Sequence, residues 1–371
     1  MQTVAQSWLV LQLSGSAFLL GLDSFLGQIP IFLFSILGGV IADRVDRRHL
    51  LVMSQIVQMT CAFGLAALFA LGVVHVWQIL ALSFVVGLAQ AFGGPAYQAI
   101  VPTLVDPKDL PNAIALNSIQ FNAARVIGPV LGGLALTKLG ASWCFSLNGL
   151  SFVAVIIALL SLSTRKSKKS GVSLLHSLKE GVAFIREREA MTALIVLAFL
   201  MTFLGIPLVT FLPVVAKEVF HQGPQTFTIL LCTSGLGAVC GALIVAALGN
   251  IHNKGRVALL MLMTLGVLIS LFGLSRSLPL SCLFLFLAGA ALIGVFAMIS
   301  SLVQLIAPDE MRGRVMSIYN VAFRGGMPIG SLICGALIPK IGVGPVLAGN
   351  GILLVMLAVY FTFAQRRVAA L

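Results

Sequence analysis

The sequence predicts an all-α membrane protein made of two bundles of six helices. Three observations predict it: long apolar runs, basic residues gathered in alternate loops, and a segment that recurs in the second half. Of the 371 residues, 59% are hydrophobic and 9% are charged, whereas soluble domains carry about 25% charged residues. Lipid offers the backbone no hydrogen-bond partners, so spanning segments must be helices or a closed barrel. Runs that are long rather than alternating favour helices.

The apolar runs define the expected spans. Crossing the hydrocarbon core takes roughly 20 helical residues. Eleven runs of that length occur, near residues 17–41, 50–72, 78–101, 110–137, 142–163, 191–215, 226–248, 257–275, 279–305, 313–338 and 344–364. A further apolar piece, Met1–Leu13, precedes them and is too short to cross.

The loops predict the orientation, because Lys and Arg accumulate in short cytoplasmic connections. Of the 23 basic residues, 17 fall in one set of alternate loops and four in the other. This predicts a multi-pass protein of the inner (plasma) membrane with a cytoplasmic C-terminus. The net charge of +12 is then a feature of topology, so no nucleic-acid partner is expected. The expected partners are the lipid bilayer, a small molecule and protons, and the expected state is a monomer.

The longest connection divides the chain. It is basic, begins with STRKSKK, and carries Leu174, Leu178, Val182 and Ile185 at helical spacing, which is typical of a surface helix. The predicted parts are an N-terminal bundle (1–163, a partial first helix plus five spans), a cytoplasmic basic linker with an amphipathic helix (164–190) and a C-terminal six-helix bundle (191–371).

An internal repeat supports this division. The segment Leu104–Ala141 recurs in outline as Leu305–Val343. In both copies an acidic, Pro-containing loop opens a helix, and a Ser lies seven residues before an intramembrane Arg (Ser118/Arg125 and Ser317/Arg324). Two homologous halves in the same orientation are expected of a parallel-repeat transporter, whose substrate site lies between the halves near the membrane midplane.

The loop after the first full span carries a specific motif, GGVIADRVDRRHLL. It resembles the signature loop of the major facilitator superfamily, with Asp46 in place of a glycine. In that family the loop forms a charge latch between the halves that biases one access state. The resemblance assigns this role to Gly39, Asp43, Arg44, Arg47 and Arg48. The alternative is that the charges only set topology.

A second motif, GPVLGG, lies within the run 110–137. Pro removes a backbone donor and Gly removes bulk, so such a helix can kink and admit a close neighbour. The motif, Gly128, Pro129, Gly132 and Gly133 here, is similar to an element of the fifth helix of proton-coupled drug antiporters. Helix packing without directional meaning is the alternative.

Across nearly its whole length the chain resembles the efflux branch of the major facilitator superfamily, which contains enterobactin and macrolide exporters. The likeness rests on MQTVAQSWLVLQLSGS, on both motifs above and on RGRVMSIYNVAFRGG. It implies two six-helix bundles with pseudo-two-fold symmetry, and export of a small amphipathic molecule (drug, macrolide or siderophore class) by alternating access with proton antiport. An importer or facilitator, or a truncated paralogue without transport, is the alternative. Members usually begin with a full first helix, so a first helix truncated at its N-terminus is expected here.

Ionisable groups inside spans are costly and are functional candidates by default. Asp23 is the one carboxylate clearly within an expected span, and it is the candidate for proton coupling; a solvated helix-end residue is the alternative. Arg125 and Arg324 fall near mid-bilayer. They could instead brace packing, and neutral polar residues could instead form interhelical hydrogen bonds. The candidates to line the cavity are Arg125, Arg324, Asn117, Gln120, Asn320 and Gln6.

Enzymatic activity is not expected. The six cysteines all fall in apolar stretches, without a CxxC pair or a His at metal-ligand spacing, so they are expected to be small buried hydrophobes. No nucleophile, base and orienting group occur together in the sequence. Neither a cofactor nor a metal is predicted.

Overall fold

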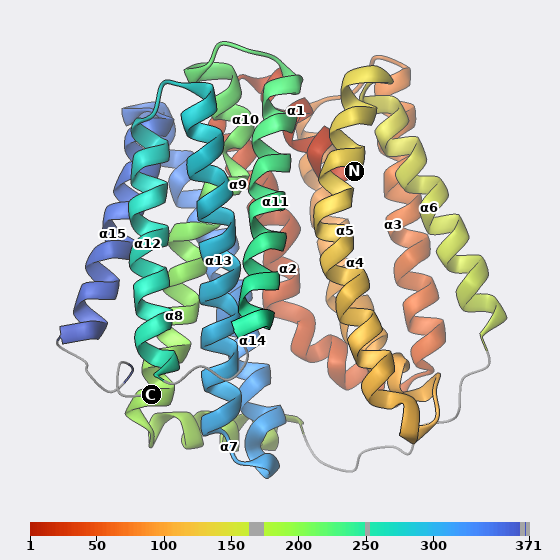
Figure 1. Cartoon of the computed structure of the whole chain (residues 1–371). Coiled ribbons are helices and arrows are strands. Elements are labelled where there is room, and N and C mark those ends of the chain that lie inside the picture. The colour runs from red at the N-terminus through yellow and green to blue at the C-terminus, as the bar shows by residue number, and fades with distance from the viewer. Residues whose placement is uncertain (163–173, 249–252, 364–367, 369–371) are drawn as a thin grey trace. The chain divides into compact units, whose positions relative to one another are not determined.

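The computed structural model describes residues 1–162, 174–248, 253–363 and 368 (Figure 1). Over these residues the chain is helical and contains no strand. The described chain divides into two compact units, Met1–Gly171 and Val172–Leu371.

The N-terminal unit is built from long helices joined by short turns. Two 3₁₀ turns, η1 (Val101–Thr103) and η2 (Pro107–Asp109), separate its fourth and fifth helices. The described helices are α1 (Gln2–Ser14), α2 (Ala17–Arg44), α3 (Arg47–Ala70), α4 (Val76–Ile100), α5 (Leu110–Lys138) and α6 (Ala141–Ser161).

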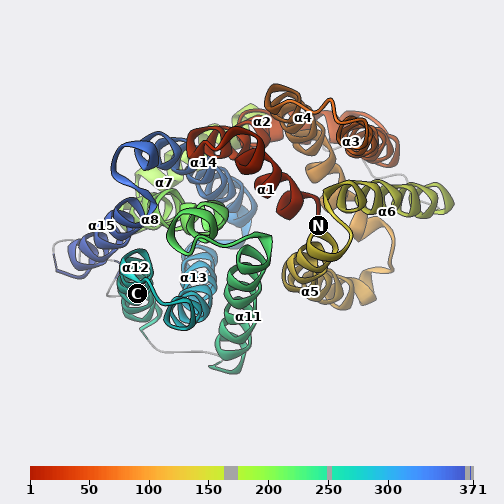
Figure 2. The same ribbon diagram turned by 90° about the horizontal axis from the view of Figure 1, so that it is seen from above.

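The C-terminal unit begins with the amphipathic α7 (Leu174–Arg186), and long helices follow. Five of them are α8 (Glu189–Gly205), α11 (Pro224–Leu248), α12 (Lys254–Leu274), α13 (Leu278–Ile306) and α14 (Asp309–Ile341), and the last described helix is α15 (Val343–Phe363). Figure 2 shows α11, α12 and α13 side by side.

The span that begins with α8 differs from the single helix expected over 191–215. It continues as α9 (Pro207–Thr210), α10 (Leu212–Val214) and a π-helical turn, η3 (Val215–Val219). Pro207 and Pro213 each remove a backbone donor and crowd the preceding turn, so the helix is interrupted at both positions. The whole stretch is nevertheless apolar enough to cross a membrane.

The protein is a multi-pass membrane protein. In the part of the chain that the structure describes, ten helices are long and apolar enough to span the bilayer. The eleventh expected span corresponds to α5. The second half of α5, Ile127–Lys138, is an apolar helical segment. Ten of the eleven apolar runs therefore each coincide with one helix, and the run 191–215 coincides with the interrupted stretch that begins with α8.

Equivalent glycine contacts hold corresponding helices together in the two units. In the N-terminal unit a Cβ at Gly38 of α2 would collide with the carbonyl of Ala91 in α4. In the C-terminal unit a Cβ at Gly237 of α11 would collide with the carbonyl of Phe286 in α13. The two pairs lie about 200 residues apart, the period of the sequence repeat. The repeated sequence thus produces repeated backbone packing.

The amphipathic α7 packs against α14 within the C-terminal unit. Gly181 faces the side chains of Ile318 and Arg314, and Ile185 is buried. Glu180 forms an ion pair of 2.5 Å with the Arg314 guanidinium. The helix is thus attached to the first half of α14 by small-residue packing and by one ion pair.

Candidate functional site

The carboxylate of Asp23 lies in the second turn of α2 and is enclosed by three helices. Ser16 caps the start of α2, its hydroxyl accepting from the Leu19 amide at 3.4 Å. Asp23 is 7% exposed. The Gln6 side-chain amide, from α1, donates to both carboxylate oxygens at 3.0 Å. The Ser83 hydroxyl, from α4, donates to one of them. Among the described side chains, the groups that bind this carboxylate are neutral.

The Gln6 amide continues into a chain of polar side chains within the N-terminal unit. The Gln2 side-chain amide donates to Oε1 of Gln6 at 3.4 Å. The Asn148 side-chain amide, from α6, donates to Oε1 of Gln2 at 2.6 Å. The chain therefore links α6, α1, α2 and α4 through hydrogen bonds that end on the Asp23 carboxylate.

Sequence reasoning identified Asp23 and Gln6 separately, and the structure brings them together. It missed Ser83. The Ser83 hydroxyl also donates to the Ile79 carbonyl one turn earlier, at 3.0 Å. Serines that bond within their own helix in this way are not distinguished in the sequence from serines that bind a functional group. The contact spans 60 residues and depends on the packing of α2 against α4, which the sequence pattern does not specify.

The first turn of α3 holds the predicted latch residues Arg47 and Arg48. The Arg47 guanidinium donates to the carbonyls of Ala42 at 3.3 Å and Ala99 at 3.1 Å. The Arg48 guanidinium donates to the carbonyl of Leu160. These carbonyls lie in the last turns of α2, α4 and α6, where cations are favourable. Both Arg side chains thus join helix ends within the N-terminal unit.

The remaining latch residues add less detail. Asp43 lies in the last turn of α2, but its side chain is outside the described part of the structure. Arg44 is exposed, and a Cβ at Gly39 would meet nothing within 4 Å. Asp46 caps α3, accepting from the amides of Arg48 at 2.8 Å and His49 at 3.4 Å.

The motif GPVLGG lies in the second half of α5, which continues through Pro129. Gly132 is the point of close approach to α1, because a Cβ there would lie 2.9 Å from the Met1 Cα. The Gly133 carbonyl accepts from the Thr137 hydroxyl at 2.9 Å. A Cβ at Gly128 would meet nothing within 4 Å. In this structure the motif therefore admits α1 through one of its glycines.

A row of exposed polar residues runs along α14. Ser317, Asn320 and Arg324 are exposed and lie on one face, at spacings of three and four residues. Tyr319 and Gly326 are buried on another face, and Gly326 contacts α8 at Thr202 and Phe199. Arg324 lies at the middle of α14. An arginine at this depth belongs in a protein interior or a water-filled path rather than in lipid.

The corresponding face of α5 is only partly described. Asn117 accepts from the Tyr97 hydroxyl, and Gln120 is exposed. The side chains of Ser118 and Arg125 lie outside the described part of the structure. The expectation that Arg125 lines the cavity therefore stays a prediction.

A multi-pass helical chain with a carboxylate buried in one span and a row of polar residues along another has features typical of a membrane transporter. The chain belongs to the family described as transmembrane secretion effector, which it matches over residues 1–370. It is thus a major facilitator superfamily transporter, and not an enzyme.

Known relatives agree with this assignment. The chain is 23% identical to macrolide efflux protein A of Streptococcus pyogenes over 93% of this chain and 87% of the relative. It is 28% identical to an enterobactin exporter of Shigella boydii over 87% and 77%, respectively. A solved bacterial homologue of the human lysosomal transporter Spinster superposes with a TM-score of 0.76 at 15% identity, covering 98% of this chain and 92% of that chain. This last likeness concerns the fold.

Proposed function

We propose that this transporter exports a small amphipathic molecule of the drug, macrolide or siderophore class by alternating access, in exchange for protons. The two bundles act as sister units in the inner membrane, with the C-terminus in the cytoplasm. The observation that carries the proposal is Asp23, a carboxylate buried within a span and bound by neutral donors. A carboxyl group in this setting can take up and release a proton without breaking an ion pair.

The names of relatives support outward transport. They include the two exporters compared above and a multidrug efflux pump of Mycolicibacterium fortuitum, 23% identical over 98% of this chain. The polar row of α14 supports a pathway for amphipathic cargo, because its amides and hydroxyls bind a molecule without requiring a charge. In this proposal Arg125 and Arg324 also face the pathway. The access state is biased by the latch residues Gly39, Asp43, Arg44, Arg47 and Arg48.

The decisive experiment is transport into inverted vesicles under an imposed pH gradient. Wild type and Asp23→Asn are compared for uptake of a siderophore, a macrolide and a dye. Asparagine keeps the shape of the side chain and removes the titratable group, so gradient-driven accumulation should disappear while downhill exchange remains. Asp46→Asn is the matched control, because Asn also caps helices well, and it should transport like wild type.

Two outcomes would contradict the proposal. Equal accumulation by Asp23→Asn and wild type would remove Asp23 from coupling. Accumulation in right-side-out vesicles, but not in inverted ones, would favour the importer.

A further inference from the structure

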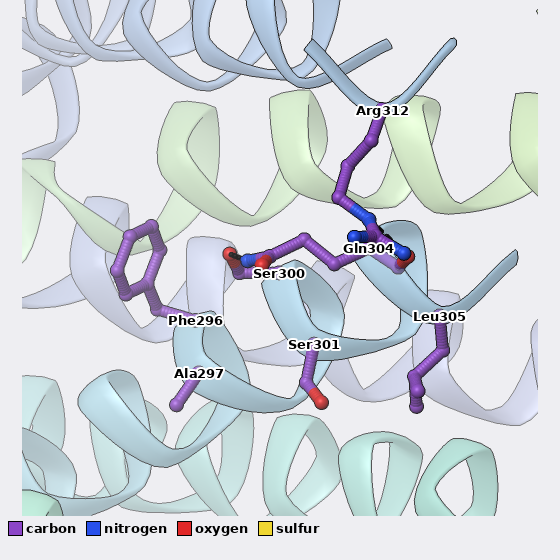
Figure 3. Close-up of a pocket in the computed structure, with 7 residues that line it drawn as sticks. All are labelled: Phe296, Ala297, Ser300, Ser301, Gln304, Leu305 and Arg312. Atoms are coloured by element: carbon purple, nitrogen blue, oxygen red, sulfur yellow. Dashed lines mark hydrogen bonds between the residues drawn. The ribbon is translucent and has the colours of Figure 1, made fainter. Parts of the chain in front are cut away.

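A pocket of about 380 Å³ lies along α13, within the C-terminal unit (Figure 3). It is separate from the Asp23 site, which belongs to the N-terminal unit. The pocket is lined by Phe296, Ala297, Ser300, Ser301, Gln304, Leu305 and Arg312.

The spacing of residues on α13 builds this pocket. Phe296, Ser300 and Gln304 form one row at intervals of four residues, and Ala297, Ser301 and Leu305 form the row beside it. The opposite face, with Val295, Ile299 and Leu302, is buried in the bundle. The lining rows thus lie on the side of α13 that faces away from these buried residues.

The pocket combines an aromatic wall with neutral polar groups. The Phe296 ring packs on the Phe323 ring, with centroids 4.7 Å apart, and Phe323 stacks on Tyr319 at 6.1 Å. The Gln304 amide donates to the Ser300 hydroxyl at 3.3 Å. A fixed ring beside hydroxyl and amide groups suits a ligand that has an aromatic or apolar ring at one end and oxygen functions at the other.

The charge at the pocket is already neutralised. Arg312 forms an ion pair of 2.6 Å with Asp309 and donates to the Gln304 carbonyl at 3.3 Å. None of the lining residues is a carboxylate. A cationic ligand would therefore find no counter-charge among the lining residues, and an anionic ligand would share Arg312 with Asp309, so the pocket suits an uncharged molecule.

The polar residues that line the pocket extend into the membrane-spanning part of α13. Phe296 lies ten residues before the end of α13 at Ile306, which is about 15 Å of helix. The rows thus extend from the end that the predicted topology places at the cytoplasmic surface to about the middle of the span. An exporter meets its cargo from this side.

We propose that this pocket is a second binding site, which takes an uncharged, ring-bearing molecule with hydroxyl or amide groups. That this molecule is cargo on its way to export rests on the function proposed above; binding itself does not. The ring stacks on Phe296, and the oxygen groups bond to Ser300, Ser301 and Gln304.

The test is equilibrium dialysis of radiolabelled chloramphenicol against the purified full chain in detergent. Chloramphenicol has no net charge and carries an aromatic ring, two hydroxyl groups and an amide. The double variant Ser300→Ala/Gln304→Ala should weaken binding about tenfold, because two hydrogen bonds are lost. Phe296→Leu keeps the apolar volume and should weaken binding about threefold through loss of the ring. Thr264→Val is the matched control, since Thr264 is exposed on α12 and its hydroxyl bonds its own helix at Leu260.

Charged competitors complete the test. Excess salicylate (an anion) or ethidium (a cation) should leave chloramphenicol binding at this pocket unchanged. Unaltered affinity in both pocket variants, or equal loss in Thr264→Val, would overturn the proposal. Displacement by salicylate would show an anion site instead. Loss of gradient-driven accumulation in Asp23→Asn with intact binding would be expected. Binding without export by wild type would refute the proposed function and leave the pocket site standing.

Discussion

Asp46 stands where the resembling loop carries glycine, and its side chain has a local role. The carboxylate accepts from the first free amides of α3, which have no partner inside the helix. The residue therefore acts as a helix cap, while Arg47 and Arg48 bond to the ends of neighbouring helices.

We predict a graded effect of substitutions at Asp46. Ala removes the cap and should lower the free energy of unfolding by about 1 kcal/mol, whereas Gly, the residue of the resembling loop, should cost only about a few tenths. The measurement is the thermal unfolding midpoint of the purified protein in detergent, with Asp46→Asn as the control that keeps an acceptor oxygen. A midpoint for Asp46→Ala equal to wild type would rule out the capping role.

Individual site residues were predictable from the sequence where a polar or charged side chain lay inside an apolar segment. A carboxylate inside an apolar run identified Asp23, and a glutamine in the first apolar piece made Gln6 a candidate. Their contact, and the participation of Ser83, depend on the packing of α1, α2 and α4. A single sequence does not specify such packing, because small polar residues are common in membrane helices for other reasons.

At the scale of helices, close approach depends on glycine at a few positions. In the C-terminal unit Gly237 lets α11 touch the backbone of α13 at Phe286. Helix association in lipid relies on this kind of packing, since the surrounding lipid removes the hydrophobic driving force between helices.

We expect Gly237→Ala to separate these two helices. The added Cβ would meet a backbone carbonyl, which cannot rotate away as a side chain can, so the cost should be about 1–3 kcal/mol or more. The measurement is the temperature at which half of the purified protein is lost from the monodisperse peak in size-exclusion chromatography. Gly349→Ala on α15 is the matched control, because a Cβ there would meet nothing within 4 Å. Equal midpoint temperatures for Gly237→Ala and Gly349→Ala would show that the close contact at Gly237 does not contribute to stability.

The positions of the helices were the most predictable feature, because a span must be long, apolar and hydrogen-bonded within itself. Ten of the eleven expected runs each correspond to one helix, and the run 191–215 corresponds to an interrupted stretch. The interruption after α8 was not predicted, although Pro207 and Pro213 were its visible cause. Prolines are tolerated within other helices of this chain, such as α4 and α14, so proline alone does not decide where a span breaks.

At the scale of the whole molecule, the repeat places related helices in both units and makes α5 and α14 counterparts. The period of the glycine contacts and the family match over nearly the full chain agree with a duplicated architecture. The two units are not chemically equal, however. The buried carboxylate belongs to the N-terminal unit and the described pocket to the C-terminal unit, so a division of labour between proton and cargo binding is the arrangement to test.

Whether the polar row of α14 lines a water-filled pathway can be tested by cysteine labelling. A cysteine reacts quickly in water and slowly in lipid. We predict that Asn320→Cys, in a background without the six native cysteines, reacts with a membrane-impermeant methanethiosulfonate about tenfold faster than Ile333→Cys, because the reaction needs a hydrated thiolate. Ile333 is the matched control, since it is 44% exposed on the same helix but apolar. A transported substrate should slow the first reaction and leave the second unchanged. Equal, slow reaction at both positions would mean that Asn320 and Arg324 face lipid, and α14 would then contribute no pathway for cargo.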